Sequence, residues 1–243
     1  MNSSKAYGGK NVYGASVGVL MLDTRFPRIP GDIGHAGTWD FPLMYHIVRG
    51  ASVQKVVCEN AEGLLQDFID AGLELVDMGA DGITTTCGFL ALYQNELAEA
   101  LKVPVAASSL MQIPIVQSLL PPDKKVGVLT VSAANLGESH LKAIGVPLDT
   151  PIMGTEQGQE FSRVMINNET VLDVELARQD LVQAGDMLKA SHPELGAVVL
   201  ECTNMMPYAA DIQRALGVPV YSMYTFLNWF QSGLMPQRFS GEY

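Results

Sequence analysis

A repeat within the chain limits its possible folds more than any other feature of the sequence. Residues 82–108 align with residues 197–223 without a gap, at a constant offset of 115 residues that places Cys87 on Cys202. In each copy a β-branched apolar run ends at the cysteine and is followed by a stretch with helical apolar spacing and then a Val-Pro-Val segment. Strands that alternate with helices of this length predict right-handed crossovers and a parallel sheet.

A second, shorter match supports the duplication. Residues 17–20 and residues 126–129 both read VGVL, at an offset of 109 residues. We therefore expect an α/β fold of two doubly wound parallel-sheet domains, related by a pseudo-twofold axis, with the active site in the cleft between them. The first domain is expected to comprise residues 1–110 together with residues 222–243, and the second residues 111–221.

The apolar pattern also predicts the individual elements. Besides the two strands that precede the cysteines, Ile83–Thr86 and Ala197–Leu200, strands are expected at Ala15–Leu22, Val53–Cys58, Val103–Ala107, Val126–Val131, Pro151–Gly154 and Val218–Met223. Helices are expected at Ala61–Met78, Leu136–Ile144, Glu169–Ala190 and Thr225–Gln231. Asn167 and Asn168 are expected to cap the third of these helices.

Composition narrows the classes of function. The chain has 243 residues and a net charge of −11, which argues against nucleic-acid binding because neutralising phosphates requires a basic surface. No apolar run approaches the roughly 18 residues that a membrane span needs, and no export signal is evident, so we expect a cytoplasmic protein. Its three cysteines, Cys58, Cys87 and Cys202, match no zinc-binding spacing.

The repeat makes Cys87 and Cys202 candidates for catalysis. Ligands of open parallel sheets bind beyond the carboxyl ends of the strands, where both cysteines are expected. Each would then lie at the start of a helix, a position that favours the thiolate over the usual pKa of about 8.5. If the two sheet ends face each other, one thiolate can remove a proton from a substrate carbon while the opposite thiol delivers another.

Other interpretations of the cysteines remain open. A cysteine in an apolar strand is usually a small buried hydrophobe, and this is the interpretation that we favour for Cys58. For Cys87 and Cys202 a structural role, a disulfide or metal ligation each has less support, because the duplication places both at one site and no histidine completes a coordination shell.

The motifs Thr84-Thr85-Thr86-Cys87-Gly88 and Glu201-Cys202-Thr203-Asn204 resemble the two cysteine signatures of the aspartate/glutamate/hydantoin racemase superfamily. The resemblance covers essentially the whole chain. It implies two-base proton transfer by Cys87 and Cys202 without a cofactor, and it implies that Thr203 helps to bind the substrate carboxylate. The motif neighbours Thr86, Gly88 and Asn204 are expected beside the substrate.

The segment that follows the first predicted strand departs from the usual amino-acid racemases. Its Gly-Asp-Ile-Gly sequence at residues 31–34 resembles a subgroup that includes the algal dimethylsulfoniopropionate lyases. Its prolines and glycines predict an irregular loop at the cleft. In this loop Asp32 and His35 could tune a thiol or orient a substrate, and Arg25 could pair with a carboxylate. Each could equally serve a structural or solvent-exposed role.

Polar residues at other strand ends complete the candidate set of substrate-binding positions. They are Asp23, Thr24, Ser108, Thr130 and Ser132. Asp23 and Ser132 are equivalent positions in the two halves, at the offset of 109 residues.

Three functions are compatible with these observations. The leading hypothesis is a cofactor-independent racemase or epimerase acting on a carboxylate-bearing substrate. The first alternative is a lyase or isomerase on the same scaffold, either by β-elimination or by maleate-type isomerisation. The second alternative is a small-ligand binding module without chemistry. No metal or other cofactor is expected, and the resemblance implies a possible homodimer.

Overall fold

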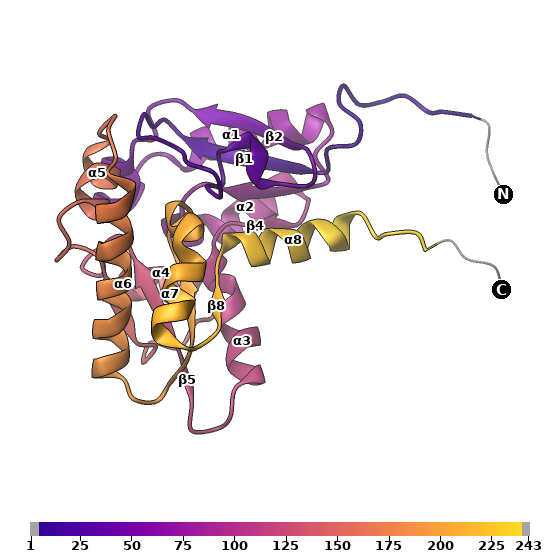
Figure 1. Cartoon of the computed structure of the whole chain (residues 1–243). Coiled ribbons are helices and arrows are strands. Elements are labelled where there is room, and N and C mark those ends of the chain that lie inside the picture. The colour runs from indigo at the N-terminus through magenta and orange to yellow at the C-terminus, as the bar shows by residue number, and fades with distance from the viewer. Residues whose placement is uncertain (1–4, 240–243) are drawn as a thin grey trace.

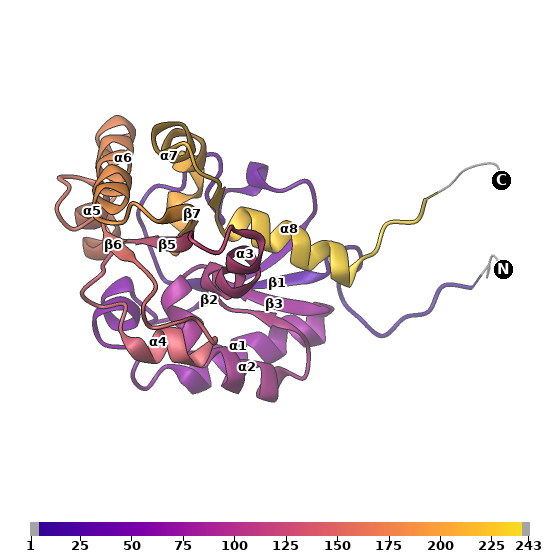
Figure 2. The ribbon, with the colours of Figure 1, turned by 90° about the horizontal axis from the view of Figure 1, so that it is seen from below.

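The computed structural model describes residues 5–239 and contains two parallel four-stranded sheets (Figures 1 and 2). The first has the strand order β2-β1-β3-β4, and its strands are β1 (Val17–Leu22), β2 (Leu43–Val48), β3 (Gly82–Thr85) and β4 (Val105–Ala106). The second has the order β6-β5-β7-β8, and its strands are β5 (Lys125–Thr130), β6 (Ile152–Gly154), β7 (Leu195–Leu200) and β8 (Val220–Tyr221). The second order repeats the first with each strand four places later, so the predicted two-sheet α/β fold is confirmed.

Helices cover the faces of both sheets (Figure 2). The α-helices are α1 (Leu65–Met78), α2 (Gln94–Leu101), α3 (Ile113–Leu119), α4 (Glu138–Ala143), α5 (Phe161–Asn167), α6 (Val174–Ser191), α7 (Ala209–Leu216) and α8 (Met223–Leu234). The shorter helical segments are Ala36–Thr38, Gln54–Cys58, Gly88–Tyr93, Ser109–Gln112 and Thr203–Tyr208. No helix in the described part of the chain is long and apolar enough to cross a membrane.

One predicted strand is wrong. Val53–Cys58 contains a turn of π-helix over Gln54–Cys58, and the strand that pairs with β1 is instead β2, which lies beyond the predicted loop in a stretch with no predicted element. Val53, Val56 and Val57 are the buried residues of this segment, and their spacing matches one face of a helix rather than the alternation of a strand.

The start of the longest helix also differs from the prediction. Asp173 caps α6, because its carboxylate accepts hydrogen bonds from the backbone N–H groups of Glu175 and Leu176, both at 3.0 Å. Asn167 ends α5, and Asn168 follows it with a left-handed backbone (φ 56°). The two asparagines therefore terminate one helix instead of starting the next.

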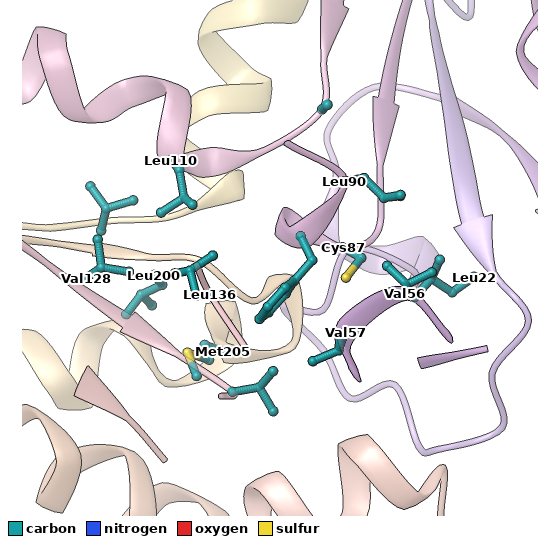
Figure 3. Close-up of a cluster of buried hydrophobic side chains, with 14 of the residues drawn as sticks. Leu22, Val56, Val57, Cys87, Leu90, Leu110, Val128, Leu136, Leu200 and Met205 are labelled. Carbon is teal, nitrogen blue, oxygen red and sulfur yellow. The ribbon is translucent and has the colours of Figure 1, made fainter. Parts of the chain in front are cut away.

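The hydrophobic core is continuous across the two sheets. Figure 3 shows Cys87, Leu90 and Val56 from the first half in one cluster with Leu200 and Met205 from the second. The halves therefore share buried apolar surface, and the cysteine of the first half lies within it.

The last helix returns to the first sheet. Helix α8 runs alongside the N-terminal half in both views, and a Cβ atom added to Gly82 of β3 would lie 2.7 Å from carbons of Phe230 and Leu234 (Figures 1 and 2). The chain therefore passes between the halves twice, before α3 and before α8. The amide of Gln112 joins these passages, since it donates to the carbonyl of Ser222 at 3.0 Å and accepts from the hydroxyl of Thr225 at 2.8 Å.

Candidate active site

Cys87 and Cys202 occupy equivalent positions in the two halves. Cys87 follows β3 and precedes the 3₁₀ helix Gly88–Tyr93, while Cys202 follows β7 and precedes the 3₁₀ helix Thr203–Tyr208. Both are free thiols, and both line one cavity between the carboxyl ends of the two sheets. The structure thus brings together the two groups that the repeat singled out.

The cavity is small and mostly apolar. Its remaining walls are Leu22, Thr24, Phe26, Arg28, Val53, Val57, Thr86, Phe89, Val131, Met165, Glu201 and Asn204. The space open to the centre of a water molecule is about 20 Å³, which accommodates about one water. Among the described residues that line it, Arg28 is the one cationic side chain. A substrate larger than water therefore requires the walls to move apart.

Glu201 is a carboxyl group buried beside both cysteines. It immediately precedes Cys202 and is 1% exposed, and it accepts a hydrogen bond of 2.8 Å from the hydroxyl of Thr130. Its Oε1 atom lies against Gly88, where an added Cβ atom would approach it to 2.4 Å. Only glycine therefore fits after Cys87 while Glu201 keeps this position.

Burial raises the pKa of Glu201 to about 7 from an ordinary value of 4.5. The Thr130 hydroxyl and the backbone N–H groups of Val131, Phe89 and Gly88 favour the ionised form, but they offset only part of the effect. Near neutral pH this carboxyl therefore exists in both protonation states.

The thiols are held in their protonated form, which is opposite to the predicted thiolate. Burial makes the largest contribution to the raised pKa of both Cys87 and Cys202, and the negative charge of the Glu201 carboxylate makes the second largest. The predicted helix-start effect exists, because backbone N–H groups of Phe89 and Leu90 lower the pKa of Cys87. It is outweighed because the cavity excludes water.

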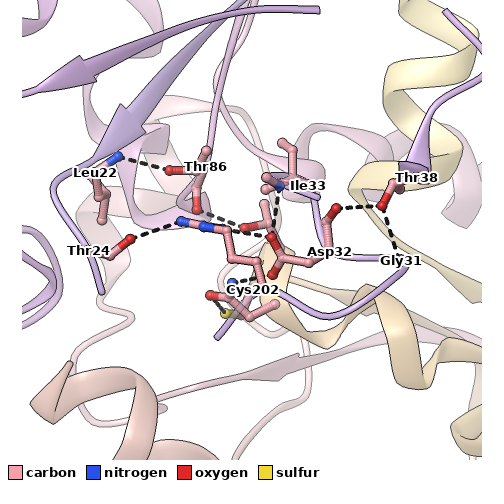
Figure 4. Close-up of polar contacts among 12 residues, drawn as sticks. Leu22, Thr24, Gly31, Asp32, Ile33, Thr38, Thr86 and Cys202 are labelled. Atoms are coloured by element: carbon pink, nitrogen blue, oxygen red, sulfur yellow. Dashed lines mark hydrogen bonds and ion pairs between the residues drawn. The ribbon is translucent and has the colours of Figure 1, made fainter. Parts of the chain in front are cut away.

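The Gly-Asp-Ile-Gly loop contacts the second cysteine through a polar chain (Figure 4). Asp32 is 2% exposed, pairs with Arg28 at 2.7 Å and accepts from the amide of Asn204 at 2.5 Å. The Oδ1 atom of Asn204 in turn accepts from the thiol of Cys202 at 3.5 Å. Asp32 thus holds the guanidinium of Arg28 in the cavity wall, and it also holds the Asn204 side chain that accepts from the Cys202 thiol.

The other expected residues fall into three groups. Thr24 and Thr86 line the cavity together with Asn204. Thr24 accepts a hydrogen bond from Arg28 at 3.0 Å, and Thr86 accepts one from the backbone N–H of Leu22 at 3.0 Å. Gly88, Thr130, Thr203 and Asp32 lie behind the cavity wall and contact its residues.

The third group lies away from the cavity. Arg25 is exposed, Asp23 pairs with Arg49 at 3.4 Å, and His35 caps the short helix that follows it. Ser108 caps the 3₁₀ helix Ser109–Gln112, and Ser132 accepts a hydrogen bond from Asn135 at 2.9 Å. The cation beside the thiols is Arg28 and not Arg25, and it lies just before a turn in which the N–H of Asp32 donates to the carbonyl of Ile29 at 3.0 Å.

Sequence reasoning missed Arg28 and Glu201. A signal was present for Glu201, since an acidic residue ends an otherwise apolar strand and replaces Thr86 of the first copy. Arg28 had no such signal beyond its place in the loop. No group of three or more histidine, cysteine or acidic side chains within residues 5–239 is arranged to hold a metal ion.

The sequence is similar to dimethylsulfoniopropionate lyases. It is 29% identical to one from Durusdinium sp. clade D over 236 residues, which cover 93% of this chain and 77% of that protein. It is 31% identical to dimethylsulfoniopropionate lyase 3 of Emiliania huxleyi (strain CCMP1516), over 90% of this chain. The chain spans 60% of the length of that second relative. No protein-family model matches the chain.

Solved structures share the fold. A variant of arylmalonate decarboxylase in its sulfate-associated form matches with a TM-score of 0.61 at 17% identity, covering 93% of this chain and 97% of that one. An aspartate racemase homologue from Pyrococcus horikoshii OT3 matches with a TM-score of 0.59 at 14% identity, covering 90% and 98% of the two chains.

Proposed function

We propose that this chain is an enzyme of the aspartate/glutamate racemase superfamily and acts as a cofactor-independent lyase that cleaves a β-sulfonium carboxylate such as dimethylsulfoniopropionate. Its similarity to dimethylsulfoniopropionate lyases along about nine-tenths of its length carries the proposal. The site supports it with two thiols, one cation and several apolar walls around one cavity. The comparisons thus favour elimination, the first alternative from the sequence, over racemisation.

In this proposal Arg28 binds the substrate carboxylate. Two of its N–H groups already bond to Asp32 and Thr24, and a guanidinium has five donors, so three remain. The Arg28 guanidinium carbon also lies 5.0 Å from the centre of the Phe26 ring. These contacts fix the plane of the guanidinium before a ligand arrives.

The sulfonium group would lie among the aromatic and apolar walls formed by Phe26, Phe89 and Met165. Aromatic rings attract cations through their negative faces. A bound cation also lowers the pKa of a nearby thiol, because it stabilises the thiolate. Substrate binding would thereby generate the base from a thiol that burial keeps protonated.

Cys87 is the proposed base. Backbone N–H groups of Phe89 and Leu90 both favour its thiolate, whereas Cys202 has one such donor, from Asn204, and faces the charge of Asp32. The Cys87 thiolate removes the proton α to the carboxylate, and the C–H electrons form the carbon–carbon double bond. The bond from the β-carbon to sulfur breaks, and its electrons leave on neutral dimethyl sulfide. Acrylate and a protonated Cys87 remain.

Racemisation is the second candidate. Two thiols from equivalent halves lining one cavity can remove a proton from one face of a carbon and return one to the other. In this case both cysteines are required equally, and the C–H bond is the one substrate bond that breaks; the opposite thiol gives up its S–H proton to form the new C–H bond.

Incubation of the purified protein with dimethylsulfoniopropionate in deuterated water tests the proposal. We expect dimethyl sulfide in the headspace and acrylate in solution, with loss of both products in Cys87→Ala. Cys58→Ala is the matched control, because Cys58 does not line the cavity, and it should keep wild-type activity. If dimethylsulfoniopropionate yields neither product, but a chiral amino acid incubated in the same way incorporates deuterium at its α-carbon without forming an alkene, the racemase is supported instead.

A further inference from the structure

Glu201 breaks the symmetry of the repeat at the active site. The offset of 115 residues places it on Thr86, a neutral side chain that contacts the backbone of β1. The second half thus introduces an ionisable group where the first has a hydroxyl. The elimination chemistry proposed above uses Cys87 and Arg28, and leaves this carboxyl unexplained.

The position of Glu201 links it to both cysteines. It adjoins Cys202 in the chain, its Oε1 atom lies against the residue that follows Cys87, and all three side chains line one cavity with room for about one water. Oε1 has no aligned hydrogen-bond donor among the described residues, although N–H groups of Gly88 and Phe89 lie near enough to favour its ionised form.

We propose that Glu201 controls the ionisation of Cys87 and Cys202. The carboxyl and the two thiols form one ionising unit, which carries a single negative charge shared among the three groups. Near neutral pH both thiols stay protonated while Glu201 is ionised, and a thiolate forms as Glu201 takes up a proton. The transfer breaks an S–H bond and forms an O–H bond, so the cavity keeps the same net charge.

The charges around this unit allow one anion and disfavour two. Arg28 is the one cationic side chain among the described residues that line the cavity, and it is already paired with Asp32. Asp32 adds a further negative charge near Cys202, and Thr130 contributes only a neutral donor from β5. Two anions in a site of low dielectric repel strongly, so the carboxyl, which ionises at lower pH, excludes the thiolate.

The inference deepens the proposed lyase function, because it states how the base becomes available, but its test requires no substrate. Alkylation of each cysteine by iodoacetamide, followed by peptide mass spectrometry across a range of pH, reports the thiolate of each residue. In Glu201→Gln the alkylation midpoints of Cys87 and Cys202 should fall by about one pH unit or more, because the neighbouring anion is removed.

Two controls separate this effect from a general change of structure. The midpoint of Cys58 should not move in Glu201→Gln, whereas Glu59→Gln should lower the midpoint of Cys58 alone, because Glu59 raises its pKa. Thr130→Val keeps the carboxyl but removes a donor that favours its ionised form. Both active-site thiols should then alkylate about threefold faster than wild type near about pH 8.

Unchanged midpoints of Cys87 and Cys202 in a folded Glu201→Gln protein would overturn the inference, whatever the enzyme does with dimethylsulfoniopropionate. If Glu201→Gln does not fold, a rate in Thr130→Val equal to that of wild type overturns it. Conversely, suppose that the midpoints shift in Glu201→Gln while the wild-type protein releases no dimethyl sulfide. That result would support the ionising unit and refute the proposed substrate.

Discussion

The two halves of the molecule share a sheet order and a cysteine position, yet they surround their cysteines differently. In the first half Thr86, Cys87 and Gly88 combine a hydroxyl, a thiol and a bare backbone. In the second half Glu201 and Thr203 place a carboxyl and a hydroxyl on either side of Cys202. The differences complement each other, since Gly88 leaves the space that Glu201 fills and Thr203 donates to the carbonyl of Thr86 at 2.7 Å.

This comparison separates two requirements: the repeat determines where each sulfur lies, whereas the chemistry depends on the groups that surround it. The repeat needs each sulfur at a strand end, and both halves provide it. Elimination needs only one thiol to become a base, so the surroundings of the two sulfurs can differ. Each prediction below removes one of these differences.

The largest effect should come from the cysteines themselves. Cys87→Ala should lower the rate of elimination by about 10² to 10⁴, the usual range for a general base. Cys202→Ala should lower it by about tenfold, because it loses only the hydrogen bond that places Asn204. Rates of dimethyl sulfide release measure both. Equal losses in the two variants would contradict this division of roles between the cysteines.

The buried carboxyl should make stability depend on pH. Because the folded-state pKa of Glu201 is raised to about 7 from 4.5, the folded protein holds a proton that the unfolded chain loses between these values. Stability from this group is full below the lower pKa and is lost as pH rises to the upper one. The free energy of unfolding of wild type relative to Glu201→Gln should therefore fall by about 3 kcal/mol over this interval.

Urea unfolding of both proteins at a series of pH values measures this difference. Thr86→Val, at the equivalent position in the first half, carries no ionisable group and should show the same pH dependence as wild type. A flat difference between wild type and Glu201→Gln would contradict the raised pKa of the carboxyl.

Gly88→Ala should destabilise the protein more than a glycine replacement at an open position. The added Cβ atom would lie 2.4 Å from Oε1 of Glu201 and 2.6 Å from its backbone oxygen, so the two halves must shift apart. We expect a loss of about 1–3 kcal/mol in the free energy of unfolding. Gly137→Ala is the control, because a Cβ atom there meets nothing within 4 Å. Equal effects at the two positions would show that the halves do not interlock here.

The smallest effect should come from Thr203→Val. This change keeps the shape of a fully buried side chain but removes its hydrogen bond to the carbonyl of Thr86. The expected loss is about 1 kcal/mol, read from the midpoint of denaturant unfolding. A larger loss in activity than in stability would assign Thr203 a role toward the substrate, as the superfamily resemblance implies.

The sequence predicted the parts of the structure that depend on repetition. The ungapped match around Cys87 and Cys202 predicted two parallel sheets and two thiols at strand ends, because strand–helix alternation restricts the topology strongly. It failed where two patterns compete. Val53–Cys58 is rich in β-branched residues, yet the positions that it buries are spaced as in a helix.

The ionisation of the site was not predictable from local sequence. A cysteine at the start of a helix suggests a thiolate, but burial is set by the opposite half of the chain. Glu201 and Cys87 are far apart in sequence, and their proximity depends on how the two sheets meet. Asp32 likewise reaches Asn204 only through the tertiary fold.

The return of α8 to the first sheet has a mechanical consequence. The two passages of the chain between the halves lie side by side and are joined by the amide of Gln112. Two adjacent connections that are fastened together act as a hinge, which permits rotation about one axis and resists sliding or twisting. We therefore expect the two halves to rotate apart about a hinge at Gln112 when a substrate enters. This rotation would open the cavity between the two thiols.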